Sequence, residues 1–157
     1  MMQGLNFGYH LLHQIDTRID TGDIVYCSEF VFPPDCRTPA EYKKHFVDEE
    51  VAFFEGFFAK VREGHDFRIM PQQESFSTYF PRLSTVHHGF INWNWSSQDI
   101  ERFICAFDDP YPGASTFYGD KRVFIKQVRR DTRDGEFHPF MSGLVYRKLD
   151  GFVYVAS

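Results

Sequence analysis

The chain has 157 residues, of which 43% are apolar and 18% aromatic, and its formal net charge is −5 at pH 7. This length fits one ordinary domain or two small lobes, and the apolar content excludes wholesale disorder. The acidic balance argues against nucleic acid as the main partner, and no apolar run approaches the roughly 20 residues of a membrane span. Three cysteines without a CxxC pair favour reduced thiols in a cytoplasmic protein and no metal site.

The first part of the chain predicts two strands joined by an acidic loop. Residues 5–15 carry apolar side chains on both faces of an extended chain, which is typical of a strand buried inside a sheet. Residues 24–32 are β-branched and aromatic, so they predict a second strand, which ends at Pro33-Pro34. Gly22 lies in the loop between the strands, where glycine permits a positive φ.

A long helix is predicted after the second strand. Thr38-Pro39-Ala40-Glu41 is a capping box with proline at the first helical position. Aromatic and apolar residues then recur at helical spacing up to about Glu63, and Gly64 supplies the end. The next polar segment contains Pro71 and Pro81 and predicts a surface linker with one short strand near residues 78–80.

The second half predicts a short helix followed by strands. Ser96 and Asp99 cap a helix whose apolar residues fall at positions i, i+3, i+4 and i+7. Prolines at 110 and 112 end it. Strands are expected at residues 114–118, 122–128, 143–147 and 152–155, an arrangement typical of a small open barrel.

The acidic loop is the first candidate for chemistry. Asp16, Asp20 and Asp23 could perform acid–base work, bind a hard cation or simply hydrogen-bond the turn, although the spacing of a calcium loop is absent. His10 and His13 point to opposite faces of a strand, so they cannot bind one metal without a bulge. Each histidine fits a core role, and His13 could also cluster with Asp20.

The aromatic residues of the second half allow two interpretations. The turn Pro110-Tyr111-Pro112-Gly113 is either a helix stop or a rigid turn that presents Tyr111 to a ligand. Trp93 and Trp95 are two positions apart, so on a strand both side chains would lie on the same face, which is typical of core residues. We retain Tyr111 and Trp93 as candidate substrate-binding residues.

A series of motifs resembles the folate-dependent formyltransferase family, which includes methionyl-tRNA formyltransferase and the amino-sugar nucleotide formyltransferases. Leu12-His13 followed by Asp20-Thr21-Gly22-Asp23-Ile24 resembles the second signature of this family. DTGDI alone is a weak motif, but the elements that follow in the family's order make the series strong over most of the chain. These elements are Tyr79–Ser84, Ile91–Trp93, Ile100–Arg102, Ala106-Phe107 and Pro110–Ala114.

The resemblance implies an α/β fold with two parts. Residues 1–70 would be the C-terminal portion of a Rossmann-like formyltransferase domain, built as strand, loop, strand and long helix. Residues 71–89 would be a linker, and residues 90–157 would be a small OB-like β-barrel, the C-terminal subdomain.

The resemblance also implies the chemistry, which is formyl transfer from 10-formyltetrahydrofolate to an amine without a metal. Asp20 matches the catalytic aspartate, whose carboxylate would stabilise a protonated imidazole that shuttles protons. The segment Asp16, Thr17, Arg18, Ile19 and Asp20 matches the one whose backbone holds the pterin ring. The family's Asn-x-His pair does not occur in this chain. We therefore expect an N-terminally truncated piece that is inactive alone, with a degenerate relative or a partner chain as alternatives.

The acceptor amine is less defined by the sequence. The aromatic turn around Tyr111 favours a nucleotide-linked amino sugar, and the net charge of −5 disfavours tRNA. The basic stretch Lys121–Arg133 keeps methionyl-tRNA as the alternative, and a non-catalytic binding or assembly module is the second alternative. No membrane partner is expected, and a homodimer is retained as one arrangement.

Overall fold

The computed structural model describes residues 2–157 and divides the chain into two compact units. The hairpin unit comprises Asn6–Cys36 and Glu41–Arg82. The C-terminal unit comprises Arg37–Ala40 and Leu83–Ser157 with the N-terminal residues up to Leu5. Each unit has its own packed interior, so we describe them separately.

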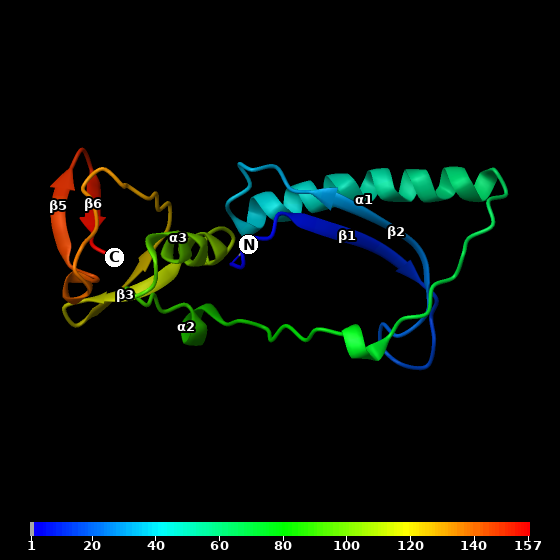
Figure 1. Cartoon of the computed structure of the whole chain (residues 1–157), viewed down its shortest axis with the longest axis horizontal. Helices are drawn as coiled ribbons and strands as arrows, with labels where there is room; N and C mark the ends of the chain where they lie inside the picture. Colours follow the sequence, from blue (N-terminus) through cyan, green and yellow to red (C-terminus); the bar gives the residue numbers. More distant parts are fainter. Residues whose placement is uncertain (1) are drawn as a thin grey trace. The chain divides into compact units, whose positions relative to one another are not determined.

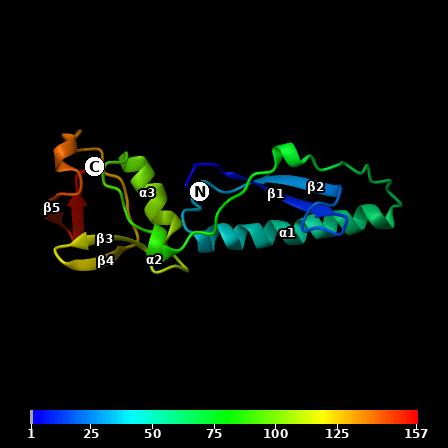
Figure 2. The same cartoon turned by 90° about the horizontal axis from the view of Figure 1, so that it is seen from below.

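The hairpin unit is an antiparallel strand pair covered on one face by a long helix (Figures 1 and 2). Strands β1 (Phe7–His13) and β2 (Ile24–Val31) pair from Phe7 opposite Val31 to His13 opposite Ile24. The helix α1 (Pro39–Arg62) lies along the hairpin, as the capping box and the aromatic spacing predicted. Aromatic rings fill the space between them, in contacts among His10, Tyr26, Phe30, Phe46, Phe53 and Phe57.

The opposite face of the strand pair is open to solvent. Tyr9 and Leu11 are each 51% exposed, and Val31 is 62% exposed. The expectation that residues 5–15 form a strand buried inside a sheet is therefore wrong for this chain. The physical reason is that β1 pairs only with β2 in the described part of the chain, so its second edge and one face have no cover.

The segment after α1 runs back past the acidic loop. Met70 and Ile24 form an isolated antiparallel bridge, with N···O distances of 2.8 and 2.9 Å in its two hydrogen bonds. A short 3₁₀ turn, η1, follows at Glu74–Phe76. The strand expected near residues 78–80 is absent, and this exposed stretch makes no ladder hydrogen bond.

The C-terminal unit is organised around one capped helix. After the single turn α2 (Thr85–His88), α3 (Ser97–Ala106) begins at Ser96, whose Oγ accepts the Asp99 N–H at 3.2 Å. The Ser96 hydroxyl also donates to the Asp99 carboxylate at 2.6 Å, so the predicted cap is confirmed. The helix buries its apolar stripe in a core formed by Ile91, Ile100, Ile104, Phe107 and Ala114.

The strands of the C-terminal unit form two separate hairpins. Strands β3 (Ala114–Tyr118) and β4 (Lys121–Ile125) form one hairpin, and β5 (Val145–Leu149) and β6 (Phe152–Val155) form the other. No barrel closes among the described residues, because each strand shares a ladder only with its sequence neighbour. Residues 126–144 hold only the 3₁₀ turn η2 (Pro139–Met141). The chain is thus mixed α/β, and the OB-like barrel and the Rossmann-like detail remain predictions.

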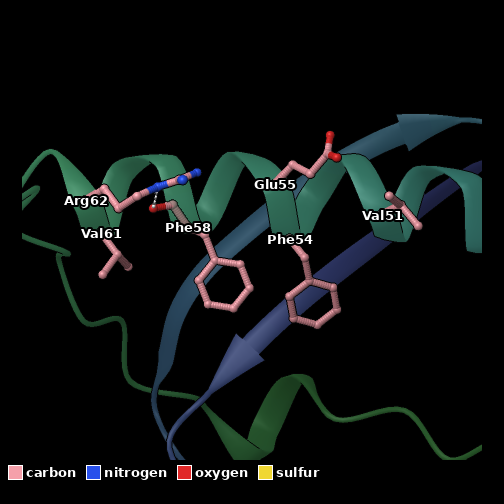
Figure 3. A pocket seen from close by; sticks show the side chains of 6 residues that line it. All are labelled: Val51, Phe54, Glu55, Phe58, Val61 and Arg62. Atoms are coloured by element: carbon pink, nitrogen blue, oxygen red, sulfur yellow. Dashed lines mark hydrogen bonds between the residues drawn. The ribbon is translucent and has the colours of Figure 1, made fainter.

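A shallow apolar groove lies on α1, where Phe54 and Phe58 are partly exposed (Figure 3). Phe54 and Phe58 point to the same side of the helix, and Val61 continues this stripe. None of the residues that line the groove belongs to the acidic loop. Across residues 2–157, no helix combines the length and the apolar character that crossing a membrane requires.

Candidate active site

The acidic loop between β1 and β2 is closed at its base by the main chain. The Gln14 N–H donates to the Asp23 carbonyl oxygen at 2.9 Å. Gly22 is buried here, and a Cβ at this position would lie 1.7 Å from the Gln14 carbonyl oxygen. Gly22 does not use the positive φ that glycine permits, and its lack of a side chain instead allows this close approach. Asp20 adopts the left-handed conformation instead, with φ of 55°.

The Asp16 carboxylate holds the loop together from inside. Its Oδ1 accepts the Arg18 N–H at 2.8 Å, and the Thr21 hydroxyl lies 2.7 and 2.8 Å from its two oxygens. The Arg18 amide, followed by the Thr21 hydroxyl, lowers the pKa of Asp16 from its ordinary value. Asp16 is therefore ionised and occupied by the turn, and residues 17–19 between these contacts are exposed.

Asp20 faces His13 across the mouth of the loop. The His13 Nε2 lies 3.7 Å from the Asp20 Oδ1, within ion-pair distance when the imidazole is protonated. The His13 Nδ1 lies 3.0 Å from the Gln14 carbonyl oxygen, which can only accept, so Nδ1 carries a hydrogen. The other ring nitrogen, Nε2, is thus the one that faces Asp20. Since the Asp20 side chain is 83% exposed, a ligand could reach this pair.

The two strand histidines have different surroundings, as their spacing predicted. His10 is 5% exposed and lies among aromatic rings, with ring centroids 4.8 Å from Phe30 and 4.3 Å from Phe46. This confirms the core interpretation of His10. A register shift between Leu12 and His13 turns the strand end, which places His13 beside the loop.

Gln72 completes the site from a distant part of the sequence. Its Nε2 donates to the Asp20 carbonyl oxygen at 3.1 Å and to the Gly22 carbonyl oxygen at 2.6 Å. The sequence reasoning missed this residue, because a glutamine in a polar segment some 50 residues away carries no periodic or motif signal. The adjacent bridge of Met70 with Ile24 is what brings it to the loop.

The two residues retained for substrate binding belong to the C-terminal unit. The Trp93 Nε1 donates to the Thr116 hydroxyl at 3.0 Å, and the indole packs against the core cluster of this unit. Tyr111 is 48% exposed, and its N–H donates to the Asp108 carbonyl oxygen at 2.9 Å within the turn. The Trp93 indole is thus engaged within the unit, whereas Tyr111 is half exposed, and substrate binding by either residue stays a prediction.

The basic stretch Lys121–Arg133 is largely engaged within its own unit. Four of its six basic side chains have partners that occupy their charged ends. These are Arg122 with the Val86 carbonyl oxygen, Lys126 with Asp109, Arg130 with Glu101, and Arg133 with Asp131. Within residues 2–157, no group of three metal-ligating side chains gathers at one place.

Comparisons with known proteins indicate a family. Residues 84–157 match the family described as "Formyl transferase, C-terminal domain". The chain is 30% identical over 123 residues to the cytosolic 10-formyltetrahydrofolate dehydrogenase of Xenopus tropicalis. The match covers 78% of this chain and 13% of that protein, so the chain spans a small part of this relative's length.

Two solved structures share the fold. HypX from Aquifex aeolicus gives a TM-score of 0.68 at 21% identity, covering 99% of this chain and 27% of its own. Methionyl-tRNA formyltransferase from Clostridium thermocellum gives 0.57 at 17% identity, covering 83% of this chain and 54% of its own. At these identities the likeness concerns the fold alone.

The sequence match of the C-terminal unit and the relative that aligns across most of the chain agree with each other. Both connect the chain with proteins whose names refer to formyl groups. Residues 84–157 belong to the formyltransferase family by this match, which confirms the resemblance found in the motifs of the chain.

Proposed function

We propose that the intact protein transfers the formyl group of 10-formyltetrahydrofolate to the amino group of a nucleotide-linked amino sugar. The observation that carries this proposal is the Asp20 carboxylate in the DTGDI loop, facing the His13 Nε2 at 3.7 Å. The matches to formyltransferase proteins support the reaction class, which is formyl transfer.

The reaction requires proton transfer at two nitrogens. The acceptor amine forms a bond to the formyl carbon and loses a proton, while the bond from that carbon to the folate nitrogen breaks and this nitrogen gains one. Asp20 acts as the carboxylate that stabilises a neighbouring protonated imidazole, which carries the proton between them. His13 is the imidazole that this chain places there, and the family's Asn-x-His pair does not occur in the sequence.

The backbone of Asp16, Thr17, Arg18, Ile19 and Asp20 is proposed to hold the pterin ring. Two features support this role. The Asp16 side chain is bonded to Arg18 and Thr21, so the loop has a fixed shape before a ligand arrives. The Ile19 side chain is 89% exposed beside these main-chain groups, where it offers apolar contact to a flat ring.

The test is a formyl-transfer assay on the intact protein with a nucleotide-linked amino sugar. We expect Asp20→Asn to lower kcat by about 10²- to 10⁴-fold, the range for loss of a positioned acid–base group. The matched control is Asp23→Asn in the same loop, which we expect to be near wild type because Asp23 closes the loop through its main-chain oxygen. The proposal fails if Asp20→Asn keeps full activity. The 157-residue chain by itself should show no turnover.

Methionyl-tRNA is the second candidate acceptor, and the basic stretch Lys121–Arg133 favours it. The partners of Arg122, Lys126, Arg130 and Arg133 support the sugar instead, because paired cations release fewer counterions from a phosphate backbone. Tight tRNA binding with a steep salt dependence, and no binding of amino-sugar nucleotides, would reverse this preference.

Three further proposals concern the setting of the protein. A cytoplasmic location is supported by three free cysteines and by the cytosolic relative. A homodimer is retained, and light scattering would test it. Tyr111 is proposed as a substrate contact because its ring is exposed. If the intact protein turned over no amine, a non-catalytic binding or assembly module would replace the enzyme.

A further inference from the structure

We propose that Gln72 is a positioning residue that holds Asp20 in the conformation in which its carboxylate faces His13. This inference rests on the proposed function, in which Asp20 acts in formyl transfer. Gln72 lies outside the acidic loop and touches it only through its side-chain amide.

Asp20 has few other restraints. Its φ of 55° lies in the left-handed region, which is strained for a residue with a side chain. Its side chain is 83% exposed, and in the described part of the chain the only hydrogen bond to Asp20 is the one that Gln72 donates to its carbonyl oxygen. A change of the Asp20 φ to a negative value would relieve this strain, but it would carry the Asp20 carbonyl oxygen away from Gln72 and turn the side chain. The carboxylate would then leave the His13 Nε2.

The chemistry at position 72 requires a donor. Both acceptors are carbonyl oxygens, so only the amide nitrogen of Gln72 can face them, and the same nitrogen bonds Asp20 and Gly22. An ionised glutamate of the same size has no donor, and it would repel both oxygens. Met70 lies two residues before Gln72, and its bridge with Ile24 holds this part of the chain against the loop.

The neighbouring residue provides a matched control. Gln73 is exposed, and it precedes η1 without a side-chain hydrogen bond to the cap. Gln73→Glu therefore adds the same negative charge one residue further along the chain. It leaves the Gln72 side-chain amide, which holds the loop, unchanged.

The experiment measures formyl-transfer kinetics on the intact protein for Gln72→Glu, Gln73→Glu, Asp20→Asn and the double variant Gln72→Glu/Asp20→Asn. We expect Gln72→Glu to lower kcat about tenfold or more, and Gln73→Glu to leave it unchanged; tenfold corresponds to about 1.4 kcal/mol. In the Asp20→Asn background, Gln72→Glu should cause no further loss, because residues that act as a unit are non-additive. An equal loss in both backgrounds, or no loss in the wild-type background, would overturn the proposal.

A second measurement is independent of activity. The ¹³C chemical shifts of the Asp20 Cα and Cβ report its φ, and we expect them to leave their left-handed values in Gln72→Glu but not in Gln73→Glu. Unchanged shifts in both variants would overturn the positioning role. If the wild-type protein transferred no formyl group, the proposed function would fail, while these shifts would still decide whether Gln72 positions Asp20.

Discussion

Replacing Gly22 by alanine places a methyl group against the main chain of Gln14. The added carbon would lie 1.7 Å from the Gln14 carbonyl oxygen and 2.6 Å from its carbonyl carbon. Ordinary contacts of a Cβ begin at 3.4 Å, so the two segments must separate by about 1.7 Å. Both neighbours are backbone atoms, so no side-chain rotation relieves the overlap.

The cost follows from what this separation breaks. It stretches the bond from Gln14 to Asp23 beyond hydrogen-bond distance and weakens the bond from Gln72 to Gly22. Two such bonds contribute about 1 to 3 kcal/mol net, and overpacking adds about 1 to 3 kcal/mol. We therefore expect Gly22→Ala to lower the free energy of unfolding of the hairpin unit by about 2 to 6 kcal/mol.

Gly56 in α1 provides the control in the same unit. A Cβ there would meet only the Tyr26 hydroxyl oxygen at 3.6 Å, an ordinary contact. Gly56→Ala should therefore raise the free energy of unfolding by about 0.5 to 1 kcal/mol, because glycine is unfavourable in a helix interior. The two substitutions add the same methyl group and are expected to act with opposite sign.

Urea unfolding of the wild-type chain and the two variants tests this. Near-UV circular dichroism follows the aromatic packing of the whole chain, which includes the contact of Phe53 with Tyr26 in the hairpin unit. Tryptophan fluorescence serves as an internal control, because Trp93 and Trp95 both lie in the C-terminal unit. The reasoning is refuted if Gly22→Ala matches the wild type, or if Gly56→Ala destabilises the chain more than Gly22→Ala does.

Two local hydrogen bonds give further predictions. Thr21→Val should raise the pKa of Asp16 toward its ordinary value, although the larger effect of the Arg18 amide remains, and Thr17→Val should not. Because the folded pKa is lowered, Asp16 stabilises the fold above its ordinary pKa and loses this effect as the pH falls through the folded value. Thr21→Val should move that loss to higher pH, as carboxyl NMR titration would show. Ser96→Ala should lower the stability of the C-terminal unit by about 1 kcal/mol in denaturant unfolding.

The sequence by itself determined the elements whose signals are local. The capping boxes at Thr38 and Ser96 and the 3.6-residue spacing of apolar side chains predicted α1 and α3. The strand signals of the sequence predicted the six strands that the structure describes, although residues 78–80 form none, and the DTGDI motif located the acidic loop. These features depend on residues within about one or two helical turns of each other, so a single sequence carries them.

The tertiary structure decided what depends on contacts between distant residues. Only the folded chain shows that Gln72 is bonded to the loop and that Gly22 lies against the main chain of Gln14. The partners of Lys126 and Arg130 likewise show that a basic stretch in the sequence is a set of internal ion pairs. The open face of β1 and the absence of a barrel joining the two C-terminal hairpins also depend on the tertiary structure. Which strands become sheet neighbours is set by long-range pairing, and no local pattern encodes it.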